Sequence, residues 1–229
     1  MTNDTQQKSN QTNSWQHTQN EAYLNLIKQR IASVNLTWVE QLIEYFKSES
    51  DNHNTKSLKD IGCQTFQVYK QLKANSFNTR YYGYELDQQY VQIGLEFFPE
   101  LRENIVIGDF NLVSDPITTD WSVCSSTLEH IDDWHRCLEK ILSTTKDTAY
   151  IRTFLGNETK RTECRQYGAS DGYPVWQFSF EDLLSSIKRL GFKPFIEIDS
   201  FTRSLPRLLD IDPDGVVRQT YVVIAKRSS

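Results

Sequence analysis

The chain has 229 residues, of which 38% are hydrophobic, and a formal net charge of −5. This length suits one large domain with an appendage, and it is ample for a sizeable core. The acidic balance disfavours a broad electrostatic interaction with nucleic acids, and no stretch approaches the roughly 18 apolar residues of a membrane span. The 4 cysteines have no C-x-x-C spacing. We interpret them as free thiols in a reducing compartment and expect a cytoplasmic protein.

The first part of the chain divides into a polar segment and a helical one. Residues 1–17 hold few apolar side chains and are predicted to form a disordered leader. Within residues 18–50, apolar side chains recur at intervals of three and four in Tyr23–Ile31 and again in Trp38–Phe46, which predicts two amphipathic helices. Each helix has one apolar stripe that is too small for a core of its own. Both must therefore bury it against the main domain, residues 56–229.

From residue 56 onward, short apolar runs alternate with helical patterns. We predict strands at Ser57–Gly62, Tyr81–Leu86, Asn104–Ile107, Trp121–Ser125, Thr148–Phe154, Phe192–Ile198 and Tyr221–Ala225. Helices are predicted at Phe66–Ala74, Gln88–Phe98, Asp132–Leu142 and Phe180–Leu190. Strands that alternate with helices predict an α/β fold with a doubly wound parallel sheet. The connection before the last strand contains Pro206, Pro213 and Gly215 and little helical pattern, which favours an antiparallel hairpin at the end.

The segment Leu58–Phe66 resembles the first motif of class I S-adenosylmethionine-dependent methyltransferases, whose usual form is Asp/Glu-x-Gly-x-Gly-x-Gly. Gly62 occupies the first glycine position, whereas Gln64 and Phe66 replace the other two. Five later segments resemble the following strands of the superfamily and their flanking turns, in the expected order. These segments are Tyr82–Asp87, Ile105–Phe110, Asp120–Ile131, Tyr150–Phe154 and Leu190–Phe195. In addition, Gly172–Phe180 is similar to methyltransferases from bacterial polysaccharide or natural-product clusters.

This resemblance implies a Rossmann-like sheet of seven strands, the last one antiparallel, and S-adenosyl-L-methionine as the cofactor beyond the strands' carboxyl ends. Glu85 would accept hydrogen bonds from the ribose hydroxyls, Asp109 would bind the adenine amine, and Phe110 could stack on the base. Asp60 would hold the backbone of the first loop near the methionine amino group. The cofactor-binding residues that the resemblance implies are Asp60, Gly62, Cys63, Gln64, Glu85, Leu86, Asp109, Phe110 and Ser125.

Methyl transfer requires orientation of the reactants and, for a hydroxyl acceptor, a base. The resemblance places His130 just past the fourth strand, with Glu129 beside it, and we take both as candidate catalytic residues. His130 could instead be a structural residue at the start of a helix, and Glu129, Asp132 and Asp133 could cap that helix. A metal site would need convergent ligands, which spacing alone does not show, so no metal site is predicted and a metal is kept as the minority interpretation of this acidic cluster.

The acceptor pocket is expected to combine the N-terminal helices with the stretch Gly156–Trp176. The aromatic candidates for its walls are Tyr23, Tyr167, Tyr173 and Trp176, each of which could instead pack in the core. A basic run in the same stretch could bind an anionic acceptor, although such runs are usually solvated. This run consists of Lys160, Arg161 and Arg165.

Taken together, these features predict a methyltransferase that acts on oxygen or nitrogen of a small-molecule biosynthetic intermediate, without a nucleic-acid or membrane partner. Residues 18–50 are then expected to form a helical lid over the acceptor site, because the ligand of an open sheet lies above the strand ends. The alternative is that both helices pack on a face of the sheet away from the site. Gln64 and Phe66 motivate a competing hypothesis, in which the fold serves a non-catalytic binding or scaffold protein.

Overall fold

The computed structural model describes residues 21–49, 56–164, 173–209 and 215–228. The helices are α1 (Glu21–Ser33), α2 (Thr37–Glu49), α3 (Gln67–Ala74), α4 (Gln88–Phe97), α5 (Trp134–Ser143) and α6 (Phe180–Arg189), with short 3-10 turns η2 (Pro99–Asn104), η3 (Phe110–Leu112) and η4 (Leu128–His130). The strands are β1 (Lys56–Ile61), β2 (Thr79–Glu85), β3 (Ile105–Ile107), β4 (Thr119–Ser125), β5 (Thr145–Gly156), β6 (Lys160–Cys164), β7 (Tyr173–Ser179), β8 (Phe192–Ile198), β9 (Arg207–Leu208) and β10 (Val217–Arg227). The predicted leader, residues 1–17, lies outside the described residues.

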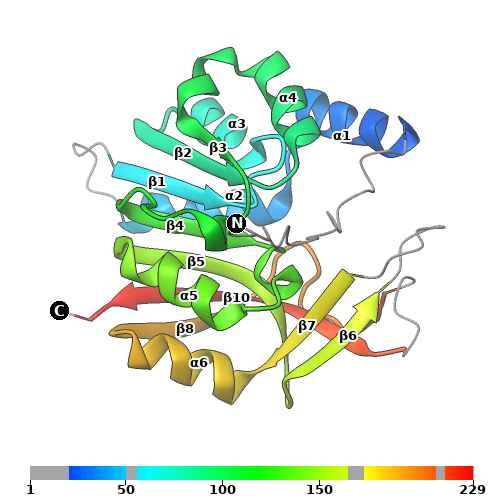
Figure 1. Cartoon of the computed structure of the whole chain (residues 1–229), viewed down its shortest axis with the longest axis vertical. Helices are drawn as coiled ribbons and strands as arrows, with labels where there is room; N and C mark the ends of the chain where they lie inside the picture. The colour runs from blue at the N-terminus through cyan, green and yellow to red at the C-terminus, as the bar shows by residue number, and fades with distance from the viewer. Residues whose placement is uncertain (1–20, 50–55, 165–172, 210–214, 229) are drawn as a thin grey trace, which may run out of the picture.

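The central sheet has the strand order β3-β2-β1-β4-β5-β10-β8 (Figure 1). Neighbouring strands from β3 to β5 run parallel, whereas β10 runs antiparallel to both β5 and β8. The predicted doubly wound sheet of seven strands with an antiparallel last strand is thereby confirmed. The strand order reverses between β1 and β4, and in open α/β sheets such a switch point is where ligands bind.

Three short strands extend the sheet beyond the prediction. β6 and β7 form an antiparallel hairpin, and the end of β7 pairs in parallel with the end of β5. β9 pairs with the start of β10. The sequence predicts no strand within Gly156–Trp176, because β6 is short and carries charged side chains at its exposed positions.

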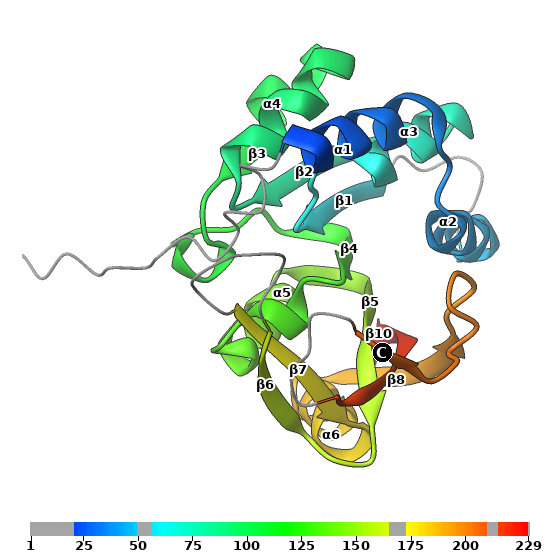
Figure 2. The ribbon, with the colours of Figure 1, turned by 90° about the vertical axis from the view of Figure 1, so that its right-hand side faces the viewer.

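Helices cover both faces of the sheet with separate apolar clusters. Apolar residues of α5 and α6 pack with one face of the sheet, and those of α2 and α3 pack with the other. Figure 2 shows α2 on one side of the sheet and α5 and α6 on the other side. Within the second cluster, the ring of Phe46 in α2 stacks on Trp121 of β4 with a centroid distance of 4.0 Å. None of the described helices combines the length and the apolar character that crossing a bilayer would require.

Candidate functional site

A cavity of about 1030 Å³ opens at the carboxyl ends of β1, β2, β3 and β4, where the strand order reverses. Its volume lies at the upper end of the range of roughly 300–1,000 Å³ that is usual for small-molecule sites. Every residue that the sequence predicts to bind the cofactor lines this cavity, namely Asp60, Gly62, Cys63, Gln64, Glu85, Leu86, Asp109, Phe110 and Ser125. The cavity thus brings together side chains from four separate strand ends.

The first loop, which follows β1, keeps the backbone conformation of a glycine loop although two glycines are missing. Gly62, Gln64 and Phe66 have φ values of +73°, +48° and +69°, all in the left-handed region. A Cβ atom at Gly62 would lie 2.1 Å from Oγ1 of Thr127, so no other residue fits there. The left-handed conformation costs a side-chain-bearing residue on the order of 1–2 kcal/mol. Favourable interactions in the rest of the fold must offset this cost at Gln64 and Phe66.

The bulky ring of Phe66 is accommodated by a glycine elsewhere in the chain. Phe66 is fully buried, and a Cβ atom at Gly94 of α4 would lie 2.4 Å from its ring. Gly94 therefore leaves the space that the ring fills. In the usual motif, the third glycine allows the following helix to pack closely. Here Phe66 takes that position, and the small Gly94 faces its large ring.

Glu85 ties the first loop to the end of β2. Its carboxylate accepts hydrogen bonds from the backbone N–H groups of Gln64, at 2.8 Å, and Asp87, at 2.9 Å. Burial raises the pKa of Glu85 above its ordinary value, and these two hydrogen bonds act in the opposite direction. Each carboxylate oxygen can accept more than one hydrogen bond, so both can also receive a hydroxyl of a ligand.

Asp60 lies in β1 with its carboxyl group buried at the edge of the cavity. The hydroxyl of Tyr81 in β2 donates a hydrogen bond to it at 2.7 Å. The resemblance implied the first-loop backbone as the partner of Asp60, and it gave no indication of Tyr81. Burial raises the pKa of Asp60 to about 7, and the neighbouring carboxylate of Glu85 adds to this effect. A cationic group of a ligand would favour the ionised form.

Asp109 begins the turn η3, where its carboxylate accepts a hydrogen bond from the backbone N–H of Asn111 at 2.8 Å. The ring of Phe110 is 4% exposed and meets the ring of Tyr84 edge-on, with a centroid distance of 4.9 Å, so it is mostly packed in the core. Lys140 of α5 donates hydrogen bonds to three carbonyl groups of this loop, including that of Phe110. Lys140 thereby fixes the loop, a role that the local sequence does not indicate.

Comparison with protein-family models and with curated protein sequences gives no match. Among solved structures, a phosphoethanolamine N-methyltransferase from Haemonchus contortus aligns with a TM-score of 0.64 and 13% identity over 93% of this chain and 59% of that chain. An S-adenosylmethionine-dependent methyltransferase from Clostridium acetobutylicum aligns with a TM-score of 0.61 and 10% identity over 91% and 99% of the two chains. The 1,6-didemethyltoxoflavin-N1-methyltransferase from Burkholderia thailandensis gives 0.56 and 12% over 93% and 84%. The chain has the class I methyltransferase fold.

On this methyltransferase fold, the two candidate catalytic residues lie in different surroundings. His130 lines the cavity, and its Nδ1 lies 3.1 Å from the carbonyl oxygen of Pro174. Because a carbonyl only accepts, Nδ1 carries the proton and the lone pair is on Nε2. Burial lowers the pKa of His130, which favours the neutral ring. Glu129 does not line the cavity; its buried carboxylate accepts a hydrogen bond from the hydroxyl of Thr153 at 2.9 Å.

The aromatic candidates for the acceptor pocket differ in their position relative to the cavity. Tyr23 of α1 lines the cavity. Tyr173 is buried behind the lining, with its ring centroid 5.5 Å from that of His130. Trp176 does not line the cavity, because its side chain packs against the apolar cluster under α5 and α6. Tyr167 lies outside the described residues.

The predicted basic run contributes one described side chain to the cavity. Arg161 of β6 lines the cavity and forms ion pairs with Asp132, at 2.9 Å, and Glu163, at 3.0 Å. Lys160 is not part of the lining, and Arg165 lies outside the described residues. Within the described part of the chain, no three His, Cys, Asp or Glu side chains are arranged to hold a metal ion.

Helices α1 and α2 take different positions relative to the cavity. Tyr23 and Arg30 of α1 line the cavity, whereas most buried side chains of α2 pack on the face of the sheet. The connection between the helices adds Val34 and Leu36, and the first turn of α2 adds Trp38. Closure of this segment as a lid stays a prediction, and α1 is the part that is placed to perform it.

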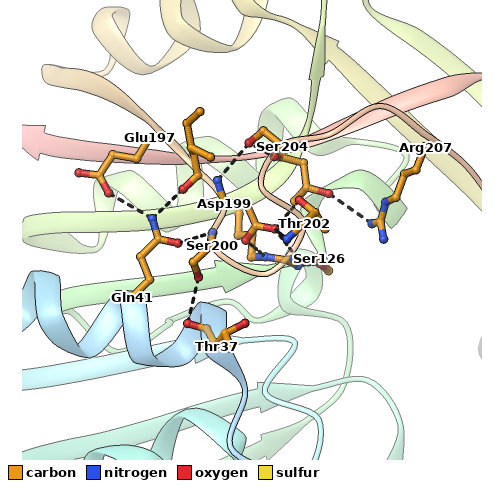
Figure 3. Close-up of polar contacts among 12 residues, drawn as sticks. Thr37, Gln41, Ser126, Glu197, Asp199, Ser200, Thr202, Ser204 and Arg207 are labelled. Carbon is orange, nitrogen blue, oxygen red and sulfur yellow. Dashed lines mark hydrogen bonds and ion pairs between the residues drawn. The ribbon is translucent and has the colours of Figure 1, made fainter.

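A buried ion pair that the sequence analysis missed forms another part of the cavity wall. Arg152 of β5 lines the cavity and binds both carboxylate oxygens of Asp199, with distances of 2.8 Å from Nε and 3.1 Å from Nη2. A third bond of 2.6 Å runs from Nη1 to the hydroxyl of Ser126. Figure 3 shows Asp199 at the centre of the surrounding network. Burial by itself would raise the pKa of Asp199, but its hydrogen bonds with Arg152 and Thr202 and the positive charge of Arg152 together lower that pKa below its ordinary value.

Proposed function

We propose that the chain is an S-adenosylmethionine-dependent methyltransferase that acts on oxygen or nitrogen of a small-molecule biosynthetic intermediate. The observation that carries this proposal is the arrangement of Asp60, Glu85 and Asp109, which come from three adjacent strand ends and line one cavity. The cofactor has an ammonium group, two ribose hydroxyls and an adenine amine, and all three are hydrogen-bond donors that match carboxylate acceptors. Solved structures with this fold that hold S-adenosylhomocysteine together with a small molecule support the proposal.

The residues that are present fit the cofactor. Gly62 lets the first loop turn in the left-handed conformation against Thr127, where a side chain would collide, and this places the loop along the cavity. Glu85 would hold the ribose hydroxyls, Asp109 the adenine amine and Asp60 the ammonium group. When bound, the cofactor supplies a methyl group on a positively charged sulfur. The residues of the chain supply orientation and a proton acceptor.

His130 is the proposed proton acceptor. Its neutral ring carries the lone pair on Nε2, and the bond from Nδ1 to Pro174 fixes the tautomer. As the acceptor oxygen or nitrogen gains the methyl group, it becomes more acidic, and Nε2 can take its proton. Glu129 would be a positioning residue and would not take the proton itself, because its carboxylate accepts a hydrogen bond from Thr153 and lies behind the cavity lining.

A reducing, cytoplasmic environment is the proposed location of this activity. Cys63, Cys124, Cys137 and Cys164 are all buried free thiols, as expected where disulfides are kept reduced. The proposed partner is a small-molecule acceptor. The cavity is enclosed by side chains from several strands and from α1, which suits a small molecule.

The proposal predicts that Glu85→Ala weakens binding of S-adenosylmethionine by about tenfold. The substitution removes a charged acceptor of the ribose hydroxyls, and hydrogen bonds to charged groups contribute about 1.5–3 kcal/mol. Calorimetric titration of the wild-type chain and the variant measures the effect. The exposed Glu139 of α5, changed to Ala, is the matched control and should bind like the wild type. Equal affinities of all three proteins would remove Glu85 from the site, and absence of binding to the wild type would overturn the proposed function.

A further inference from the structure

One wall of the cavity carries a guanidinium group that is held in place and has N–H donors that its described protein partners do not use. Arg152 is 5% exposed and lines the cavity. Among the described residues, its bonds to Asp199 and Ser126 use three of its five N–H donors. The other two can bind an oxygen atom of a ligand. Arg152 therefore combines the fixed position of a buried side chain with unused capacity for an anion.

The loop after β8 is fastened on several sides, which fixes this wall. Asp199 accepts further hydrogen bonds from the backbone N–H and the hydroxyl of Thr202, and its own N–H donates to the hydroxyl of Ser204. From α2, Gln41 accepts a hydrogen bond from the N–H of Ser200 at 2.9 Å. Figure 3 shows these contacts joining α2 to the loop. These hydrogen bonds hold the loop in place, and with it the backbone of the residue between Ser200 and Thr202.

That residue is Phe201, a large apolar side chain that is 58% exposed and lines the cavity. The ring centroids of Trp38 and Phe201 lie 5.8 Å and 5.9 Å from Cζ of Arg152. Val34 and Leu36 are further apolar residues of the cavity lining. The exposed ring of Phe201 and the half-buried ring of Trp38 favour a ligand with a flat apolar surface, because contact removes apolar surface on both sides from water.

Three carboxylates and the guanidinium of Arg152 line the cavity at different strand ends. Asp60, Glu85 and Asp109 belong to β1, β2 and the end of β3, whereas Arg152 belongs to β5, beyond β4. The carboxylates suit the cationic cofactor. The guanidinium suits a ligand of the opposite charge, and such a ligand would also be attracted to the positively charged sulfur.

We propose that Trp38, Arg152 and Phe201, here called the acceptor wall, form the acceptor subsite and that they select an aromatic carboxylate. The ring of the acceptor packs on Trp38 and Phe201, and its carboxylate binds the remaining N–H donors of Arg152. This inference rests on the proposed methyltransferase function, whose acceptor class it specifies.

The test uses the full chain saturated with S-adenosylhomocysteine and three probes: 2-naphthoate, 2-naphthamide and acetate. Calorimetry first measures binding of S-adenosylhomocysteine, which tests the proposed function by itself, and then binding of each probe. The acceptor wall predicts that 2-naphthoate binds about tenfold more tightly than 2-naphthamide, which lacks the charge, and more tightly than acetate, which lacks the ring. If 2-naphthoate and 2-naphthamide bind equally, the proposed subsite is wrong even where S-adenosylhomocysteine binds.

Two matched variants locate the binding without disturbing the buried ion pair. Phe201→Ala is expected to weaken binding of 2-naphthoate about tenfold. Leu205→Ala removes a side chain of similar exposure, 60%, from the same loop outside the cavity lining, and should leave binding unchanged. Equal affinities of these two variants would overturn the proposal.

The double variant Arg152→Gln/Asp199→Asn should bind 2-naphthoate and 2-naphthamide equally, and a retained preference for 2-naphthoate would contradict the role of Arg152.

Discussion

Arg152→Ala is expected to lower the free energy of unfolding by about 3–5 kcal/mol. The substitution leaves the carboxylate of Asp199 buried without its guanidinium, and breaking a buried ion pair from one side costs about this much. Urea unfolding followed by fluorescence measures the loss. The exposed Arg102, changed to Ala, is the control and should alter stability by about 0.5 kcal/mol or less.

A second variant separates the ion pair from the packing of its side chains. Arg152→Met/Asp199→Leu removes both charges, so no unpaired carboxylate remains, and it should recover at least half of the stability that Arg152→Ala loses. A loss of less than about 1 kcal/mol for Arg152→Ala would show that solvent reaches Asp199. That result would also contradict the fixed geometry on which the acceptor wall depends.

Cofactor affinity is expected to increase with pH by about eightfold between pH 6 and pH 7.5. Burial raises the pKa of Asp60 to about 7, so the carboxyl group of the ligand-free protein is mostly protonated at pH 6. Binding of the cofactor's ammonium group favours the carboxylate, and the proton must first leave. Below pH 7 this release weakens binding, and above pH 7 the penalty disappears. Calorimetric titrations at a series of pH values measure the trend.

The Asp60→Asn variant is the control for this titration. Because the amide does not ionise in this range, its affinity should be lower than that of the wild-type protein at pH 7.5 and should change little with pH. In the ligand-free wild-type chain the linkage has the opposite sign. The unfolded chain ionises near the ordinary pKa of 3.8, so Asp60 lowers stability progressively from about pH 4 to pH 7. A wild-type affinity that is independent of pH would remove Asp60 from contact with the ammonium group.

The sheet and the cofactor side of the cavity could be predicted from the sequence because both depend on local signals. Apolar runs that end in Gly62, Glu85 or Asp109 mark strands followed by polar side chains. Parallel strands bring their carboxyl ends to one edge, so the residues that follow them meet without any further information. The predicted cofactor residues accordingly line one cavity.

The missed features depend on contacts between distant segments. Arg152 and Asp199 are 47 positions apart, and nothing near either residue indicates that they pair. Asp60 and Tyr81 meet because β1 and β2 are neighbours in a particular register. The hairpin of β6 and β7 is stabilised by its pairing with β5, which a short charged segment does not reveal.

The departures in the first loop illustrate the same limit. Judged alone, Gln64 and Phe66 indicate a changed loop, and they motivated the hypothesis of a non-catalytic protein. The backbone nevertheless keeps the left-handed conformation at both positions, and Gly94 makes room for the ring of Phe66. The compensating residue lies in another helix, so only the packed structure reveals it.

A crystal structure of the chain with S-adenosylhomocysteine tests the central proposal most directly. We expect the nucleoside in the cavity at the ends of β1 to β4, with the carboxylate of Glu85 within hydrogen-bond distance of the ribose hydroxyls and that of Asp109 within reach of the adenine amine. An empty cavity at saturating ligand, or a nucleoside bound away from Glu85 and Asp109, would contradict the proposed cofactor site and favour a non-catalytic binding or scaffold protein.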